Sequence, residues 1–563
     1  MTATETAPTA DVVATPRNKL TLVIVVSALV IIALDATILN VAIPTILDDF
    51  DTQLPSLQWV LTGYSLTFAT FLIIGGRLGD IYGARRMFII GALLFGVGSL
   101  IASISTSVPE LLLGEALIEG IGASLMMPAT LAILSTTFTG PSRARAFAVW
   151  GATAGASLAF GPLVGGFLTT NYSWRWSFRV NLVVVPLAVI GALLFIRRTP
   201  PSGRRQRIDV PGAFLVAAGT FLLVFALSEG GAYGWITPVR DFTVLGHVVW
   251  PGSMSLSVIP MIFVLSLVLL SQFYVVERRK ERFDLDPLFE FGQLRHLGFR
   301  YGLLTTCVLA MGQLGFLFVL PVFLQDGKHL SALENGLWLV PSGLFIVAGA
   351  QLGGRLTRFV NTTLVVRVGL TLEAVGLFLI GMVITPGITL LSLLPGFALF
   401  GIGLGFASSQ LTNVVLSEIP RERTGTASGA NSTVRQLGAA LGIAVIGSLL
   451  TTETIRGSLE RVRASTLPTA LKEHALGQLH TAGVAYTAPT GTSAADRATL
   501  SRIIESAIAS GARPALFFGA IVVAAGACLS LLIPQVRIVG EIDHSDGIET
   551  VDPVEALDVL PAH

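Results

Sequence analysis

The chain has 563 residues, of which 52% are hydrophobic and only 13% charged, and its formal net charge is +1. Soluble domains carry about 25% charged residues, so this composition excludes an ordinary water-soluble enzyme or binding domain. The basic residues stand at the ends of apolar runs rather than in one patch, which gives no sign of a nucleic-acid partner.

Apolar runs of about 18 residues or more recur along most of the sequence and predict an all-α, multi-pass membrane protein. We expect fourteen transmembrane helices, at 20–43, 57–76, 87–106, 110–135, 145–170, 177–196, 210–228, 256–276, 301–324, 333–354, 363–385, 388–415, 427–451 and 512–534. An even number of spans places both termini on the same side of the membrane.

The distribution of arginine and lysine indicates which side that is. With both termini in the cytoplasm, 21 basic residues fall in inner loops and 4 in short outer loops, and an excess in cytoplasmic loops is the usual arrangement. We therefore expect a protein of the cell (plasma) membrane with both termini cytoplasmic. Residues 1–19 and the acidic segment 537–563 are expected to be disordered cytoplasmic tails.

The first apolar run contains the carboxylate Asp35, 16 residues after Lys19 and therefore about 24 Å along a helix. A carboxylate inside a membrane span is costly and usually faces a cavity or a partner. Asp35 is thus a candidate proton site or contact for a cationic substrate. The alternative is that it bonds to nearby backbone or to Asn40 and stabilises the helix end.

A glycine-rich, charged turn, Gly-Arg-Leu-Gly-Asp-Ile-Tyr-Gly-Ala-Arg-Arg at 76–86, follows the second apolar run. It resembles the loop between helices 2 and 3 of the major facilitator superfamily. The matching residues are Gly76, Leu78, Asp80, Gly83, Arg85 and Arg86. The resemblance implies that Asp80, Arg85 and Arg86 form an inner gate, with Asp80 pairing with Arg86 or a neighbouring loop and capping a helix end. The alternative is a solvated turn that only sets the topology.

The fourth run carries two acids, Glu115 and Glu119, four residues apart and therefore on one helix face. Two close carboxylates in a low dielectric cannot both ionise cheaply, so the pair suits proton uptake and release or attraction of a cation. The superfamily usually has an arginine, associated with proton coupling, where Ala116 stands. Glu115 could alternatively lie near the outer surface and simply be solvated.

The fifth run ends in Gly-Pro-Leu-Val-Gly-Gly at 161–166. It resembles the last part of an element found in antiporters of the superfamily. Proline and small residues allow close helix packing and bending. We expect a hinge on which alternating access depends, and the resemblance implies export rather than uptake. The hinge residues are Gly155, Gly161, Pro162, Gly165 and Gly166.

An internal repeat relates the two parts of the chain, because Gly-Gly-Arg-Leu occurs at 75–78 and again at 353–356. It predicts two six-helix bundles related by a pseudo-two-fold axis. The expected domains are a bundle at 20–196, two inserted helices with linkers at 197–300, and a bundle at 301–536 that includes an extracellular loop at 452–511. Helical periodicity at 452–463 and 493–510 predicts a helical hairpin in that loop. Glu373, in the eleventh run, is a further cavity candidate.

This layout resembles the fourteen-helix drug:proton antiporter family of the superfamily. The resemblance implies a proton-driven multidrug efflux transporter, which confers antibiotic resistance by alternating access and is not an enzyme. The expected partners are a lipophilic, often cationic small molecule, protons and membrane lipid, with no nucleic acid, in a monomer. No phosphate-binding loop and no His/Cys cluster occurs in the sequence, so we expect no cofactor and no metal.

Three alternatives remain open. The first is an exporter of a lipid or of an endogenous antibiotic or metabolite on the same fold. The second is an uptake symporter, which the element at 161–166 disfavours. The third is a non-transporting membrane receptor or scaffold.

Overall fold

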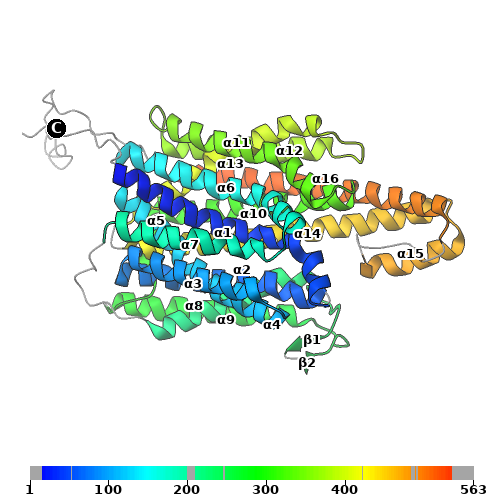
Figure 1. Cartoon of the computed structure of the whole chain (residues 1–563), viewed down its shortest axis with the longest axis horizontal. Helices are drawn as coiled ribbons and strands as arrows, with labels where there is room; N and C mark the ends of the chain where they lie inside the picture. Colours follow the sequence, from blue (N-terminus) through cyan, green and yellow to red (C-terminus); the bar gives the residue numbers. More distant parts are fainter. Residues whose placement is uncertain are drawn as a thin grey trace, which may run out of the picture.

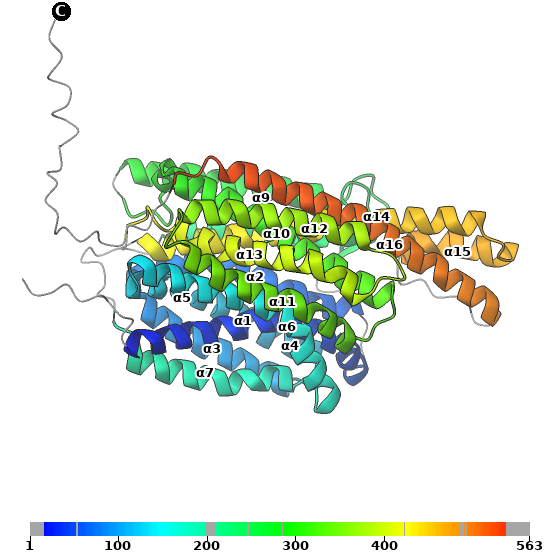
Figure 2. The same cartoon turned by 90° about the horizontal axis from the view of Figure 1, so that it is seen from above.

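The computed structural model describes residues 16–51, 54–198, 209–244, 247–283, 285–420, 423–482, 489 and 492–535. Most of the two expected tails, residues 1–15 and 537–563, lies outside these ranges. Within them the chain is almost entirely helical. The helices run side by side along one direction and form a single elongated bundle (Figures 1 and 2).

The helices fall into three groups along the chain. The first set is α1 (Pro16–Asp49), α2 (Leu54–Tyr82), α3 (Ala84–Ile104), α4 (Val108–Leu111) continued by the π-helix η1 (Leu112–Glu119) and α5 (Gly120–Thr137), then α6 (Gly140–Asn171) and α7 (Trp176–Phe195). The inserted pair is α8 (Val210–Tyr233) and α9 (Val258–Arg282). The second set follows a 3-10 turn, η2 (Phe291–Arg295), and consists of α10 (Leu297–Asp326), α11 (Ala332–Leu356), α12 (Thr362–Val383), α13 (Leu390–Val415), α14 (Thr424–Ala464), α15 (Thr469–Ala482) and α16 (Ala494–Ser530).

Twelve helices of the described residues are long and apolar enough to cross a membrane. The helices α2 and α6, of 29 and 32 residues, lie in the same bundle but are not among these twelve. The fourteen-helix count therefore stays a prediction. One short antiparallel hairpin, β1 (Phe242–Val244) and β2 (His247–Trp250), joins the inserted helices and adds a small β element to the expected all-α fold.

Contacts between the two sets lie along two seams. Helix α2 packs against α14 on one side, and α6 packs against α11 on the other. The inserted α8 contacts both α2 and α14. We call the contact between α2 and α14 the α2–α14 seam, and the contact between α6 and α11 the α6–α11 seam.

The repeated Gly-Gly-Arg-Leu segment places one glycine at each seam. A side chain on Gly76 of α2 would meet the Gly425 carbonyl carbon at 2.9 Å, and one on Gly354 of α11 would meet Ala148 Cβ of α6 at 2.8 Å. Glycine is needed at both positions because another side chain would separate the two sets. The repeat therefore marks a structurally similar place in each set.

The helices α14 and α16 extend past one end of the bundle and carry α15 between them (Figure 1). The 41 residues of α14 span about 60 Å, twice the roughly 30 Å hydrocarbon core of a bilayer. Helix α14 ends at Ala464, and α16 begins at Ala494. Both bounds lie close to those of the helical segments predicted for the loop at 452–511.

Candidate functional site

Three buried acids meet inside the first set of helices. Asp35 comes from α1, and Glu115 and Glu119 come from η1, with exposed fractions of 2%, 2% and 0%. One carboxylate oxygen from each lies within 4.8 Å of the others. The sequence predicted each acid as a candidate, and the structure brings all three together in what we call the carboxylate cluster.

Glu115 and Glu119 are positioned by the wider, π-helical turn of η1 and by two glycines, Gly98 and Gly114. A Cβ on Gly114 would lie 2.8 Å from the carbonyl oxygen of Gly98 on α3, so only glycine allows this close approach of the two helices. π-helical turns are rare and are frequent at functional sites. Glu115 is buried as a result, which excludes its expected alternative as a solvated surface residue.

Two polar side chains connect the cluster. Asn181 of α7 donates through Nδ2 to Asp35 Oδ1 at 3.4 Å and to Ser99 Oγ at 3.1 Å. The Ser99 hydroxyl in turn donates to Glu119 Oε1. A chain of hydrogen bonds through Asn181 of α7 and Ser99 of α3 therefore links Asp35 to Glu119. Sequence reasoning missed Ser99 and Asn181, although polar residues inside apolar runs were a signal that could have found them.

Several oxygen atoms of the cluster have no hydrogen-bond partner in the part of the chain that the structure describes. They are Asp35 Oδ2, Glu115 Oε2, Glu119 Oε2 and the hydroxyl of neighbouring Tyr64. No arginine or lysine of the described residues forms an ion pair with the cluster. Three carboxylates at this distance in a low dielectric cannot all be charged, so the cluster is suited to hold and exchange protons.

The charged turn contacts the second set through Asp80. Its carboxylate accepts hydrogen bonds from the backbone N–H groups of Gly425 and Thr426, both at 2.7 Å, and from the Thr426 hydroxyl. These residues form the first turn of α14, where a helix attracts negative charge. Asp80 therefore caps a helix across the α2–α14 seam.

The two arginines of the predicted gate behave differently. Arg85 donates to the Leu193 carbonyl at 2.6 Å, within the first set, and Arg86 is exposed. A second contact between the sets comes instead from Arg143, which donates to the Leu416 carbonyl at 3.2 Å.

The predicted hinge residues all lie in α6, and Gly161, Gly165 and Gly166 are buried. A Cβ on Gly165 would lie 2.9 Å from the carbonyl oxygen of Ile38 on α1. Nothing is described for Gly155 and Pro162 beyond their place in this helix. The structure thus brings the Gly165 end of the expected hinge against the helix that carries Asp35.

Glu373 is fully buried in α12 of the second set, apart from the carboxylate cluster, and neither carboxylate oxygen has a hydrogen-bond partner among the described residues. Its electrostatic partner is Arg435 of α14. Arg435 also donates to Gln313 Oε1 at 3.2 Å. Glu373 therefore lies apart from the carboxylate cluster and under the electrostatic influence of Arg435.

The fold resembles that of a solved membrane transporter. A solved structure of the human organic anion transporter MFSD10 (TETRAN) matches with a TM-score of 0.56 at 15% identity, over 92% of this chain and 99% of that one. The family model described as Major Facilitator Superfamily matches residues 25–443. The chain belongs to the major facilitator superfamily.

Curated relatives carry the names of antibiotic transport, export and resistance proteins. The "Probable actinorhodin transporter" of Streptomyces coelicolor is 32% identical over 77% of this chain and 72% of its own length. The puromycin resistance protein pur8 of Streptomyces alboniger is 32% identical over 78% and 83%. The cephamycin export protein CmcT of Amycolatopsis lactamdurans is 32% identical over 76% and 83%. These relatives bear out the resemblance to multidrug efflux transporters of the superfamily, and they are named as transport, export or resistance proteins.

Proposed function

We propose that the protein exports lipophilic small molecules across the cell membrane in exchange for protons. The carboxylate cluster is the observation that carries this proposal, because three buried acids with no basic partner among the described residues need protons to persist in a membrane. Protonation from outside lowers affinity for a cationic cargo, which then leaves outward.

Alternating access supplies the second half of the mechanism. The proposed moving parts are the two sets of helices, each a six-helix bundle, which rock about the cargo. Asp80 on the α14 N-terminus and Arg143 on Leu416 hold the inner end closed. Hydrogen bonds to charged groups contribute about 1.5–3 kcal/mol each. Before the inner end can open, proton transfer and cargo binding must supply the free energy that breaks these contacts.

Three further expectations belong to this proposal. The chain crosses the membrane fourteen times, counting α2 and α6, and both termini lie in the cytoplasm. The transporter works as a monomer. A charge that crosses 100 mV gains about 2.3 kcal/mol. Exchange of one proton for one monovalent cation moves no net charge, so the pH difference drives that exchange, whereas the potential adds to it for a neutral cargo or when more protons enter than cations leave.

The names of the relatives favour one alternative cargo, an antibiotic or metabolite that the cell itself makes. The printed names include actinorhodin transport and cephamycin export. This alternative uses the same fold and the same proton site, so only a panel of cargos separates it from general drug export.

The test is transport of ethidium into proteoliposomes under an imposed pH gradient. We expect Asp35→Asn and Glu119→Gln each to lower the gradient-driven initial rate by about tenfold or more, because each removes a proton carrier. Glu334→Gln, at an exposed helix cap of α11, is the matched control and should transport normally. A sodium gradient without a pH gradient should not drive transport.

Full gradient-dependent transport by both cluster variants would refute the assignment of the proton site. Absence of transport by the unmodified protein, with ethidium and with a panel of antibiotics, would favour the receptor or scaffold alternative.

A further inference from the structure

The segment that joins the inserted pair to the second set folds back onto the end of α9. We call this segment, residues 285–296, the strap. The fully buried Glu277 of α9 accepts hydrogen bonds from two successive backbone N–H groups of the strap, those of Leu288 and Phe289, the latter at 3.0 Å. Hydrogen bonds to a carboxylate are among the strong ones in proteins. The strap and the end of α9 therefore form one structure.

Aromatic rings continue this contact into the second set. Phe291 of the strap packs edge-on against Tyr274 of α9, with ring centroids 4.9 Å apart, and against Phe289 at 5.0 Å. Phe289 in turn stacks on the fully buried Phe299 of α10 at 6.5 Å. Aromatic pairs of this kind stabilise a structure beyond the area that they bury. One row of rings thus connects the inserted pair, the strap and the second set.

The strap is also attached beside the first turn of α14. Glu290 forms an ion pair with Arg423, the residue directly before α14. Glu418, in the loop between α13 and α14, accepts a hydrogen bond from the N–H of Gly298 at 3.3 Å, and His296 Nδ1 lies 3.9 Å from the same carboxylate. The strap is therefore held next to the end of α14 that meets the first set.

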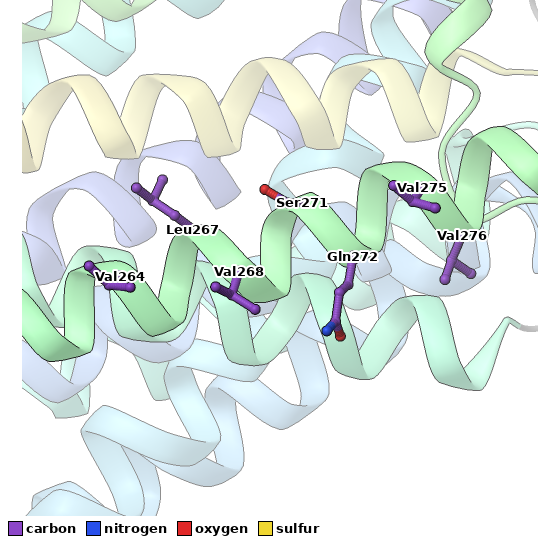
Figure 3. A pocket seen from close by; sticks show the side chains of 7 residues that line it. All are labelled: Val264, Leu267, Val268, Ser271, Gln272, Val275 and Val276. Carbon is purple, nitrogen blue, oxygen red and sulfur yellow. The ribbon is translucent and has the colours of Figure 1, made fainter.

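Within the inserted pair, α8 is joined to α9. Ser266 of α9 donates to the carbonyl of Gly219 on α8 at 2.8 Å, and Lys280 of α9 forms an ion pair with Asp209, the N-cap of α8. A hollow of about 500 Å³ on α9 is lined by side chains of that helix alone (Figure 3). Of the described elements, α8 and η2 of the strap make the extensive contacts with α9. These two elements therefore determine where α9 lies.

The inserted pair meets the first set along α2 through side chains of α8. Phe225 of α8 stacks on Trp59 with ring centroids 5.8 Å apart, and the Thr62 hydroxyl donates to Glu229 of α8 at 3.1 Å. Thr62 lies 18 residues before Asp80 on the same helix, which is about 27 Å. The contact with the first set is thus far from the end at which the strap is attached.

We propose that the strap fixes the inserted pair to the second set, so that α8 and α9 move with that set as one rigid body. This proposal rests on the proposed function, in which the two sets rock against each other. Glu290 and Glu418 are then positioning residues, because they keep the strap beside α14. The side-chain contacts between α8 and α2 are the ones that change as the sets rock.

Distances between pairs of nitroxides test which set carries the inserted pair. The labels are attached at three exposed positions in a chain with Cys307→Ala and Cys528→Ala. These positions are Arg197→Cys after α7, Arg279→Cys in the last turn of α9 and Arg358→Cys after α11. We call them the α7, α9 and α11 labels.

Asp80→Ala removes the cap on α14 and should separate the two sets, which lengthens the distance between the α7 and α11 labels. The distance between the α7 and α9 labels should change in the same variant, whereas that between the α9 and α11 labels should stay the same. A constant α7–α9 distance with a changed α9–α11 distance would assign the inserted pair to the first set and overturn the proposal.

The attachment itself is measured without any movement of the sets. In the chain that carries only the labels, the distribution of α9–α11 distances should be narrow. Glu290→Gln combined with Glu418→Gln should broaden it, because the strap loses its ties beside α14. Glu460→Gln combined with Glu473→Gln is the matched control, since it removes the same charge from exposed positions of α14 and α15, and it should leave the distribution narrow.

The outcomes separate the strap from the export function. If Asp80→Ala, added ethidium and a change of pH all leave the α7–α11 distance as it was, the sets do not rock and the proposed function fails. The width of the α9–α11 distribution still decides the attachment in that case. A broad distribution in the labelled chain, or a narrow one in the Glu290→Gln, Glu418→Gln variant, would overturn the proposal.

Discussion

Ser99 joins Glu119 to Asn181 inside the carboxylate cluster, because its hydroxyl donates to Glu119 and accepts from Asn181. We expect Ser99→Ala to cost about 1–3 kcal/mol of stability, since buried polar groups lose a partner. It should also shift the pH dependence of transport. Ser103→Ala is the matched control, because Ser103 is equally buried on α3 but bonds only to the Leu100 carbonyl at 2.8 Å. Identical pH profiles for both variants would mean that Ser99 is only structural.

The acids of this site could be read from the sequence, whereas the bonds between them could not. An ionisable residue in an apolar run is conspicuous, and this identified Asp35, Glu115 and Glu119. Their meeting point depends on how α1, α3, α7 and η1 pack, which no local pattern contains. The depth of Glu115 was left open for the same reason, since the π-helical turn that buries it has no clear sequence signal.

Among the elements, the α2–α14 seam depends on a close approach of backbones. A Cβ on Gly76 would meet the Gly425 carbonyl carbon at 2.9 Å, while Gly79, in the same turn motif, has nothing within 4 Å. We expect Gly76→Ala to push α14 away and open this end of the bundle. Gly79→Ala should leave it closed. Both variants replace a glycine by an alanine, so they differ only in whether the added methyl group meets α14 across the seam.

Distances between nitroxides on the C-terminal end of α2 and the N-terminal end of α14 would measure this opening. A longer distance for Gly76→Ala alone is the expected result. Equal distances in both variants would show that Gly76 does not hold the seam.

Element by element, the helices were predicted better than their contacts. Apolar runs placed the long helices because length and hydrophobicity decide whether a helix can cross a bilayer. The cap of Asp80 on α14 joins residues 345 positions apart. The sequence left open whether Asp80 pairs with Arg86 or with a neighbouring loop, because only the packing of α2 on α14 decides between them. The hairpin β1–β2 was not predicted, because strands of 3 and 4 residues leave almost no periodic pattern.

At the scale of the whole molecule, the extension of α14, α15 and α16 is a small domain with its own core. Leu459, Val462, Leu467, Ala475, Leu479 and Leu500 form that core. The extension is attached to the bundle through the continuous helices α14 and α16 and through His329, whose Nε2 lies 3.0 Å from Glu505 Oε1. Its core is separate from the main core, so the two should differ in stability.

Ala475→Asp tests this separation, since Ala475 is fully buried in α15. A buried unpaired charge should cost about 3 kcal/mol and raise backbone hydrogen exchange in α15, while exchange in α10 and α12 and the rate of ethidium transport stay unchanged. Ala470→Asp is the matched control, because Ala470 is exposed in the first turn of the same helix, where an acid is favourable. Faster exchange in α10 as well as α15 would show that the extension and the bundle unfold together, and the extension would then be part of one cooperative unit rather than a separate domain.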